Sequence, residues 1–96
     1  MLILYHSAKP RIQAAPALLK ALSGQTVTLP CVVHGEPSPQ VRWFHNGLPV
    51  EVRDTATLRI QQVSRSNQGT YRCVAENSAG QDTLEINLEV LGGVQF

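Results

Sequence analysis

Hydrophobic and polar residues alternate along most of this chain, with the period of two expected for β-strands that bury one face. The alternation is clearest in five segments, residues 26–33, 40–45, 57–63, 70–76 and 83–90. Glycine, proline and asparagine, which favour turns, separate these segments. No segment has a sustained helical period. The pattern therefore predicts an all-β protein built as a two-sheet antiparallel sandwich.

Residues 9–22 have a weaker pattern, which Pro10 and Pro16 interrupt. Proline has no amide hydrogen for a sheet ladder, so it belongs at sheet edges or bulges. We predict a broken first strand here, with a short helical turn over residues 15–22 as the alternative. Pro30 lies inside a strong strand, and we expect it where a neighbouring strand stops or where the first strand changes sheets.

The chain has 96 residues, which suits one domain whose single core is marginal without further support. A formal net charge of +1 gives no reason to expect binding to nucleic acid or to anionic membranes. The apolar runs are too short to insert into a bilayer or to form a secretory signal. We expect residues 10–91 to form one domain of a longer protein, with residues 1–9 and 92–96 as flanks.

Two cysteines, Cys31 and Cys73, lie 42 positions apart, and no CxxC motif is present. They are either two buried free thiols or one disulfide. A disulfide would close a loop of about forty residues and stabilise the fold by roughly 3–4 kcal/mol on the chain-entropy model. It would also place the protein in an oxidising compartment.

Trp43 follows Cys31 by twelve positions, and after Leu58 comes the segment GTYRC, which ends at Cys73. This order resembles the immunoglobulin superfamily. The segments CVVHGEPSPQVRWFHNG and CVAENSAG resemble its intermediate or I-set branch, as found in matrix and adhesion proteins of the hemicentin and perlecan kind. The resemblance implies an immunoglobulin-like sandwich with a short region between the C′ and D strands.

The resemblance also implies roles for single residues. Cys31 and Cys73 would form the disulfide between the sheets, Trp43 would pack on it, and Leu58 would join the core. The indole N–H of Trp43 needs a partner when it is buried, and the Tyr71 hydroxyl would bond to nearby backbone. Asn77 and Gly80 would form a hairpin turn, because both tolerate positive φ.

Two departures from the family pattern concern the region between Trp43 and Tyr71. Asn67 stands where relatives carry an aspartate, so an ion pair with Arg53 is lost and only local hydrogen bonds remain. The loss should be small, since exposed pairs contribute about 0–1 kcal/mol. Only 15 positions separate Trp43 from Leu58, which disfavours a variable-type domain and leaves room for only a very short D strand.

Candidate catalytic, cofactor or metal residues are not evident in the sequence. His6, His34 and His45 are far apart, and we expect them to be solvated loop residues rather than metal ligands. No nucleophile motif or phosphate loop is present. Each asparagine also fails the N-x-S/T glycosylation pattern. We therefore expect neither an enzyme nor a cofactor.

The candidate protein-contact patch comes from residues of opposite parity to the core: Arg42, Phe44, Arg72, Val74 and Glu76. Aromatic residues and arginine are enriched in interface hot spots. The alternative is that Phe44 is half-covered by the following hairpin and by arginine stems. Glu85 and Glu89 would pair across strands or be solvated. The first and last strands would leave unpaired backbone groups at sheet edges, which offer a second contact route to another domain or copy, and Lys20 and the prolines would blunt that edge. Arginines spread over both sheets argue against glycosaminoglycan binding.

We therefore expect a non-catalytic protein-interaction and spacer module of an extracellular matrix or cell-adhesion protein. Its partners would be proteins, including neighbouring immunoglobulin domains or a second copy. One alternative is a cytoplasmic structural domain of a titin-like protein. The other is a ligand-binding module of a receptor ectodomain.

Overall fold

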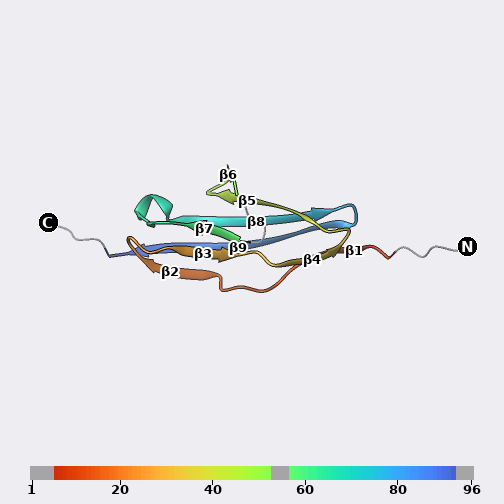
Figure 1. Ribbon diagram of the computed structural model, residues 1–96, viewed down its shortest axis with the longest axis horizontal. Helices are drawn as coiled ribbons and strands as arrows, with labels where there is room; N and C mark the ends of the chain where they lie inside the picture. Colours follow the sequence, from red (N-terminus) through yellow and green to blue (C-terminus); the bar gives the residue numbers. More distant parts are fainter. Residues whose placement is uncertain (1–5, 53–56, 93–96) are drawn as a thin grey trace, which may run out of the picture.

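The computed structural model describes residues 6–52 and 57–92. Within these ranges the chain forms nine strands and one short 3-10 helix (Figure 1). In chain order these are β1 (Ala8–Ile12), β2 (Leu18–Leu22), β3 (Val27–Pro30), β4 (Val33–Glu36), β5 (Gln40–His45), β6 (Leu48–Val50), β7 (Thr57–Ile60), η1 (Arg65–Asn67), β8 (Gly69–Asn77) and β9 (Gly80–Leu91).

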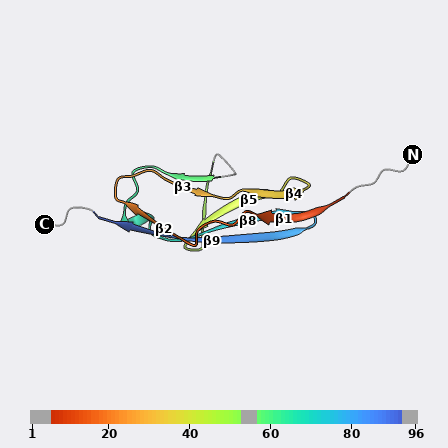
Figure 2. The ribbon, with the colours of Figure 1, turned by 90° about the horizontal axis from the view of Figure 1, so that it is seen from below.

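The strands form two layers. One layer is a five-stranded sheet in the order β2-β9-β8-β5-β6, and the other contains the pairs β1–β4 and β3–β7. In Figure 2, β3 lies above β2 and β9. Every pairing is antiparallel except β2–β9, which is parallel. The predicted all-β sandwich is confirmed, and the helical alternative for residues 15–22 is wrong because Leu18–Leu22 is a strand.

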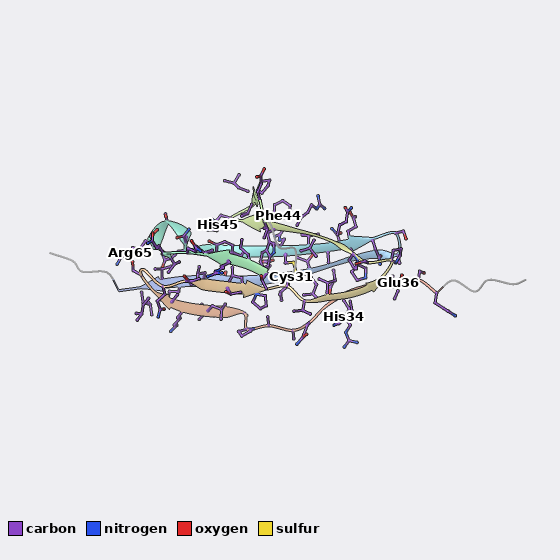
Figure 3. All side chains as sticks on the ribbon, viewed as in Figure 1. Cys31, His34, Glu36, Phe44, His45 and Arg65 are labelled. Atoms are coloured by element: carbon purple, nitrogen blue, oxygen red, sulfur yellow. A yellow bond between two sulfur atoms is a disulfide. The ribbon has the colours of Figure 1, made fainter. Side chains whose placement is uncertain are left out.

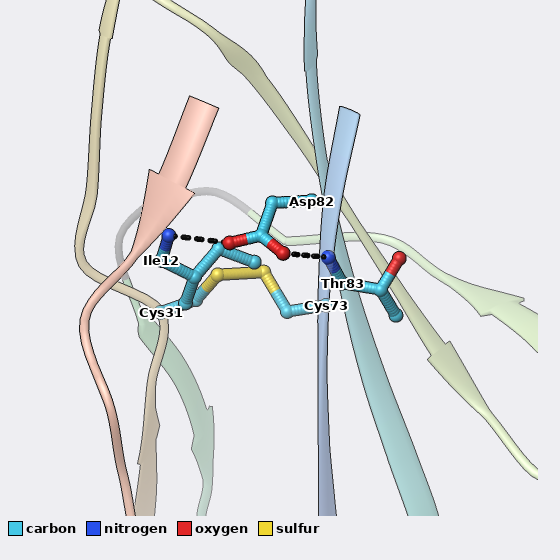
Figure 4. Close-up of a disulfide and its surroundings, with 5 residues drawn as sticks. All are labelled: Ile12, Cys31, Cys73, Asp82 and Thr83. Carbon is cyan, nitrogen blue, oxygen red and sulfur yellow. Dashed lines mark hydrogen bonds between the residues drawn. A yellow bond between two sulfur atoms is a disulfide. The ribbon is translucent and has the colours of Figure 1, made fainter. Parts of the chain in front are cut away.

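The first strand is broken because its two halves belong to different sheets. β1 pairs with β4, and β2 pairs with β9 after the Pro16 interruption. The Ile12 amide donates to the Asp82 carboxylate at 2.8 Å, which ties the end of β1 to β9 (Figure 4). The Gln13 amide then donates to the Val32 carbonyl oxygen at 2.8 Å. These bonds satisfy the backbone at the crossing point.

Pro30 is the last residue of β3, opposite Thr57 in β7. Beyond Cys31 the chain continues as β4, whose partner is β1 rather than β7. The proline therefore lies where the strand changes partners, so its missing amide hydrogen interrupts no continuous ladder.

The core lies between the layers and is apolar, with Leu29, Trp43 and Ile86 each no more than 1% exposed. Cys31 and Cys73 form a disulfide with a Cα–Cα distance of 6.4 Å (Figure 4). Cys31 comes from the segment between β3 and β4, and Cys73 lies in β8, so the bond joins the two layers. The disulfide alternative is thus confirmed over two free thiols.

Trp43 is buried opposite Val50 and Cys73 in the neighbouring strands. Its Nε1 is buried and has no hydrogen-bond partner among the described residues, so the expected partner is not found there. The apolar side chains of Val50 and Cys73 explain why these two neighbours offer none. Leu58 is 5% exposed and belongs to the same core cluster.

Tyr71 is buried in β8, and its hydroxyl donates to the backbone carbonyl oxygen of Asn67. This bond anchors the 3-10 helix η1 against the sheet. Asn67 also accepts a hydrogen bond from the Ser64 amide at 2.8 Å, which closes the turn. Burial raises the pKa of the Tyr71 hydroxyl, because the charged phenolate is poorly solvated there. Arg53 and the predicted short D strand fall at least partly outside the described residues.

The turn between β8 and β9 differs from the expectation for Asn77. Among the described non-glycine residues, only Asn46 and Gln62 have positive φ, so Asn77 does not serve the turn in that way. Its amide oxygen instead accepts hydrogen bonds from Ala79 and Gly80, at 2.8 and 3.1 Å. Asn77 therefore stabilises the turn through the hydrogen bonds of its side chain, and not through a positive φ as the sequence suggested.

Candidate protein-contact face

The predicted patch residues lie on the outer face of the five-stranded sheet. Arg42 and Phe44 are in β5, and Arg72, Val74 and Glu76 are in β8. These strands are neighbours, and their register places Arg42 opposite Val74 and Phe44 opposite Arg72. The structure therefore brings all five residues onto one surface, which we call the outer face; Phe44 is labelled in Figure 3.

One ion pair crosses strands at the outer face. Arg72 is opposite Glu85 in β9, with 3.7 Å between Arg72 Nη2 and Glu85 Oε1. Both side chains are about half exposed, at 54% and 53%, so the pair contributes only about 0–1 kcal/mol to stability. On its other side, Arg72 is opposite Phe44 in β5. Glu85 thus makes the cross-strand pair that the sequence suggested.

Val74 corrects the sequence analysis. It was expected to meet water, but it is only 7% exposed. It lies in a central strand between Arg42 in β5 and Thr83 in β9, although it is outside the main core cluster. Flanking side chains on both sides reduce its exposure. Val74 therefore lies on the outer face but, being covered by its neighbours, contributes little area that a partner could contact.

Phe44 is half-buried and lies opposite Pro49 of β6. This agrees with the expectation that the following hairpin covers part of the ring. A shallow hollow at this edge is lined by Arg42, Phe44, Pro49, Val50 and others. Phe44 and Pro49 give the hollow an apolar side, and Arg42 gives it a cationic side. The hollow therefore combines apolar and cationic groups at one edge of the outer face.

His45 also corrects the sequence analysis, because it is not a solvated loop residue. It is half-buried at the end of β5, with its ring stacked on Tyr71 at 4.2 Å between centroids and 3° between planes. His45 Nε2 lies 2.7 Å from the Gln68 carbonyl oxygen. A carbonyl can only accept, so Nε2 carries the proton. Only the β5–β8 register, which places His45 opposite Tyr71, could have revealed this contact.

The other two histidines make no shared site with His45. His34 is exposed in β4 opposite Arg11, and His6 is exposed before β1. Within residues 6–52 and 57–92, no three histidine, cysteine or acidic side chains are grouped closely enough to hold a metal ion. In the same part of the chain, no helix is long and apolar enough to cross a membrane.

Solved structures share this fold. A crystal structure of the titin M10–obscurin-like 1 immunoglobulin complex matches 92% of the chain and 99% of its own with a TM-score of 0.80 and 28% identity. The structure of the insect immune protein hemolin matches with a TM-score of 0.80 and 31% identity, covering 88% of this chain and 23% of the hemolin chain. That structure is described with implications for homophilic adhesion. Immunoglobulin domains similar to this one therefore bind protein partners, including other immunoglobulin domains.

Sequence relatives are much longer than this chain. Mouse hemicentin-2 is 40% identical over 83 residues, which are 85% of the chain and 2% of the relative. Human contactin-2 is 42% identical over 80 residues, which are 79% of this chain and 8% of contactin-2. Rat neural cell adhesion molecule 1 is 33% identical over 94 residues, covering 84% of this chain and 11% of the relative. Residues 10–90 match the immunoglobulin I-set domain. The chain belongs to the immunoglobulin I-set family, whose domain is a non-catalytic module.

Proposed function

We propose that this domain, spanning residues 10–91, is a protein-interaction and spacer module of a larger extracellular matrix or cell-adhesion protein. Its outer face, formed by Arg42, Phe44, Arg72, Val74 and Glu76, is the contact surface. The observation that carries the proposal is the position of Phe44, an aromatic ring partly open to solvent and opposite Arg72 on the outer face. Aromatic rings and guanidinium groups supply much of the binding energy at protein interfaces.

Three further observations support an extracellular setting. The Cys31–Cys73 disulfide is of the kind that persists in oxidising compartments. Among the relatives, one is named a neural cell adhesion molecule. The similar hemolin structure is discussed in terms of homophilic adhesion. Together these favour a module that holds proteins together outside the cell.

The contact surface is tested with beads that carry the domain and bind to cultured cells. The double variant Phe44→Ala/Arg72→Glu should bind about tenfold less than wild type, because it removes an aromatic contact and reverses a charge. A matched control, Val32→Ala/Arg59→Glu, makes the same kind of change at exposed positions of the opposite layer. Equal binding by both double variants would contradict a contact on the outer face.

The intracellular alternative draws on the similarity to titin M10 in its complex with obscurin-like 1. Thiol titration of protein purified from its native compartment, with and without denaturant, separates the two settings. We expect no free thiol in either condition. Two titratable thiols under denaturing conditions would support the cytoplasmic alternative instead.

A further inference from the structure

Exposed leucines gather at one edge of the five-stranded sheet. Among the described residues, five large hydrophobic side chains are exposed, and three of them lie in β2 and at the end of β9. Leu18 is 51% exposed, Leu22 is 56% exposed and Leu91 is 38% exposed. Leu22 and Leu91 are opposite each other in the parallel register. Exposed apolar patches are typical of contact surfaces, so this edge is a candidate for one.

The backbone at this edge has four free hydrogen-bonding groups. The Asn87 amide donates to the Ala17 carbonyl oxygen, and the Ser23 amide donates to the Leu91 carbonyl oxygen. Along a strand, the amide and carbonyl groups of successive residues point alternately toward and away from the neighbouring strand. Because Ala17 and Ser23 bond to β9, the backbone groups of Leu18, Lys20 and Leu22 point away from β9. No other described strand pairs with β2, which leaves the amides and carbonyls of Leu18 and Lys20 available.

Both ends of this edge are closed. The Leu22 amide donates to Gln25 Oε1 at 2.9 Å, and the Gln25 amide donates to the Leu22 carbonyl oxygen at 3.1 Å. At the other end Pro16 has no amide hydrogen to donate. The open stretch is therefore short and contains two donors and two acceptors.

A second copy of the chain matches this set of groups. In an antiparallel pairing about a two-fold axis at Leu19, Leu18 of one copy faces Lys20 of the other, and Lys20 faces Leu18. Each facing pair exchanges two backbone hydrogen bonds, so all four groups in each copy are satisfied. The next facing pair would be Leu22 and Pro16, where the closed ends stop the ladder and leave an apolar contact.

Charge selects the same register. A pairing centred on Lys20 would place the two ammonium groups directly opposite each other, which is unfavourable. It would also align Leu18 with Leu22, whose backbone groups are already bonded to Gln25. In the register centred on Leu19, each Lys20 faces an apolar side chain and has Glu89 of its own β9 beside it.

We propose that β2 is a self-association edge, through which two copies of this domain pair antiparallel about Leu19. The two five-stranded sheets then join into one continuous sheet, and Leu18 and Leu22 are covered. Because the edge offers so few hydrogen bonds, each contact is weak. Repetition along a longer protein would strengthen it through effective concentration. This edge lies beyond β9 on the same side of the sheet as the outer face, but it shares no residue with the outer face and does not depend on it.

Sedimentation equilibrium over a concentration series tests the association, with the intact 96-residue chain as the sample. Leu18→Lys places like charges opposite each other at both facing pairs and should weaken dimerisation by about tenfold. Leu18→Glu faces Lys20 of the other copy and should dimerise at least as well as wild type. The matched control is Leu48→Lys, which changes the most exposed leucine of the described residues, at 70%, on the distant β5–β6 hairpin.

Cysteine cross-linking tests the register. Leu18→Cys/Lys20→Cys should form covalent dimers under mild oxidation, whereas Lys20→Cys alone should not, because the two Lys20 positions are diagonal rather than opposite. Covalent dimers from Lys20→Cys alone would overturn the register. A wild-type chain that stays monomeric at every concentration, or equal effects of Leu18→Lys and Leu48→Lys, would overturn the proposal. Phe44→Ala/Arg72→Glu should leave dimerisation unchanged, which distinguishes this edge from the outer face.

Discussion

The Asn46 side chain fills the space beside Gly69. Asn46 Oδ1 accepts a hydrogen bond from the Thr70 amide at 2.9 Å, and this joins the β5–β6 turn to the start of β8. A Cβ atom on Gly69 would come within 2.8 Å of Asn46 Cγ. Gly69 also has a φ of +133°, which residues with side chains rarely adopt. Asn46 and Gly69 therefore depend on each other, although 23 positions separate them.

Gly69→Ala should lower the free energy of unfolding by about 1–3 kcal/mol, measured by urea denaturation. Gly24→Ala is the matched control, because Gly24 has a φ of +94° and nothing within 4 Å of its Cβ position. The difference between the two variants isolates the collision with Asn46. Equal losses would show that backbone conformation alone sets the requirement for glycine.

Asn77→Ala should destabilise the domain by about 2 kcal/mol, because the side chain satisfies several backbone groups at once. Its Nδ2 donates to the carbonyl oxygens of Ala8 and Pro37, at 2.8 and 2.9 Å. Its Oδ1 accepts from the β8–β9 turn. The control Asn87→Ala loses a bond to Thr70 alone among the described side chains and should cost much less. A loss as small as that of the control would mean that water replaces the Asn77 bonds.

Tyr71→Phe should lower stability by about 1 kcal/mol at neutral pH, because it removes the hydrogen bond to the Asn67 carbonyl oxygen. Burial raises the folded-state pKa of Tyr71 above its ordinary value of 10.0. The unfolded chain therefore loses this proton first, so the stability linked to Tyr71 is complete below pH 10.0 and falls as the pH rises through the folded-state pKa. Denaturation of both proteins from pH 7 to 11 should show the wild-type advantage shrinking only at the alkaline end. An advantage that grows with pH would contradict the effect of burial.

Removing the disulfide should lower stability by about 3–4 kcal/mol on the chain-entropy model, with a further loss for the space left in the core. The comparison is Cys31→Ala/Cys73→Ala against oxidised wild type, with the fluorescence of Trp43 as the readout. Wild type in strong reductant should approach the double variant. Unchanged stability under reduction, with free thiols verified, would show that packing alone holds the layers together.

The sequence by itself determined the fold class, most of the strand segments and the disulfide partners, but residues 26–33, predicted as one strand, form parts of β3 and β4. Period-two alternation indicates strands with one buried face. This signal is local, so the sequence alone is enough to find it. The break near Pro16 and the position of Pro30 were also predictable, because proline cannot donate to a ladder wherever the chain places it. Strand parity likewise identified which residues of β5 and β8 point outward.

Only the tertiary structure decided how far those side chains reach solvent and which distant groups meet. Val74 has outward parity, yet flanking strands cover it. His45 was expected in water, yet the register stacks it on Tyr71. The free edge of β2 comes from the parallel pairing with β9, and the two hydrogen bonds between Leu22 and Gln25 close one end of it. Strand order and register decide how exposed a side chain is and which residues it contacts. They bring together residues that are far apart in the sequence, so no local pattern predicts them.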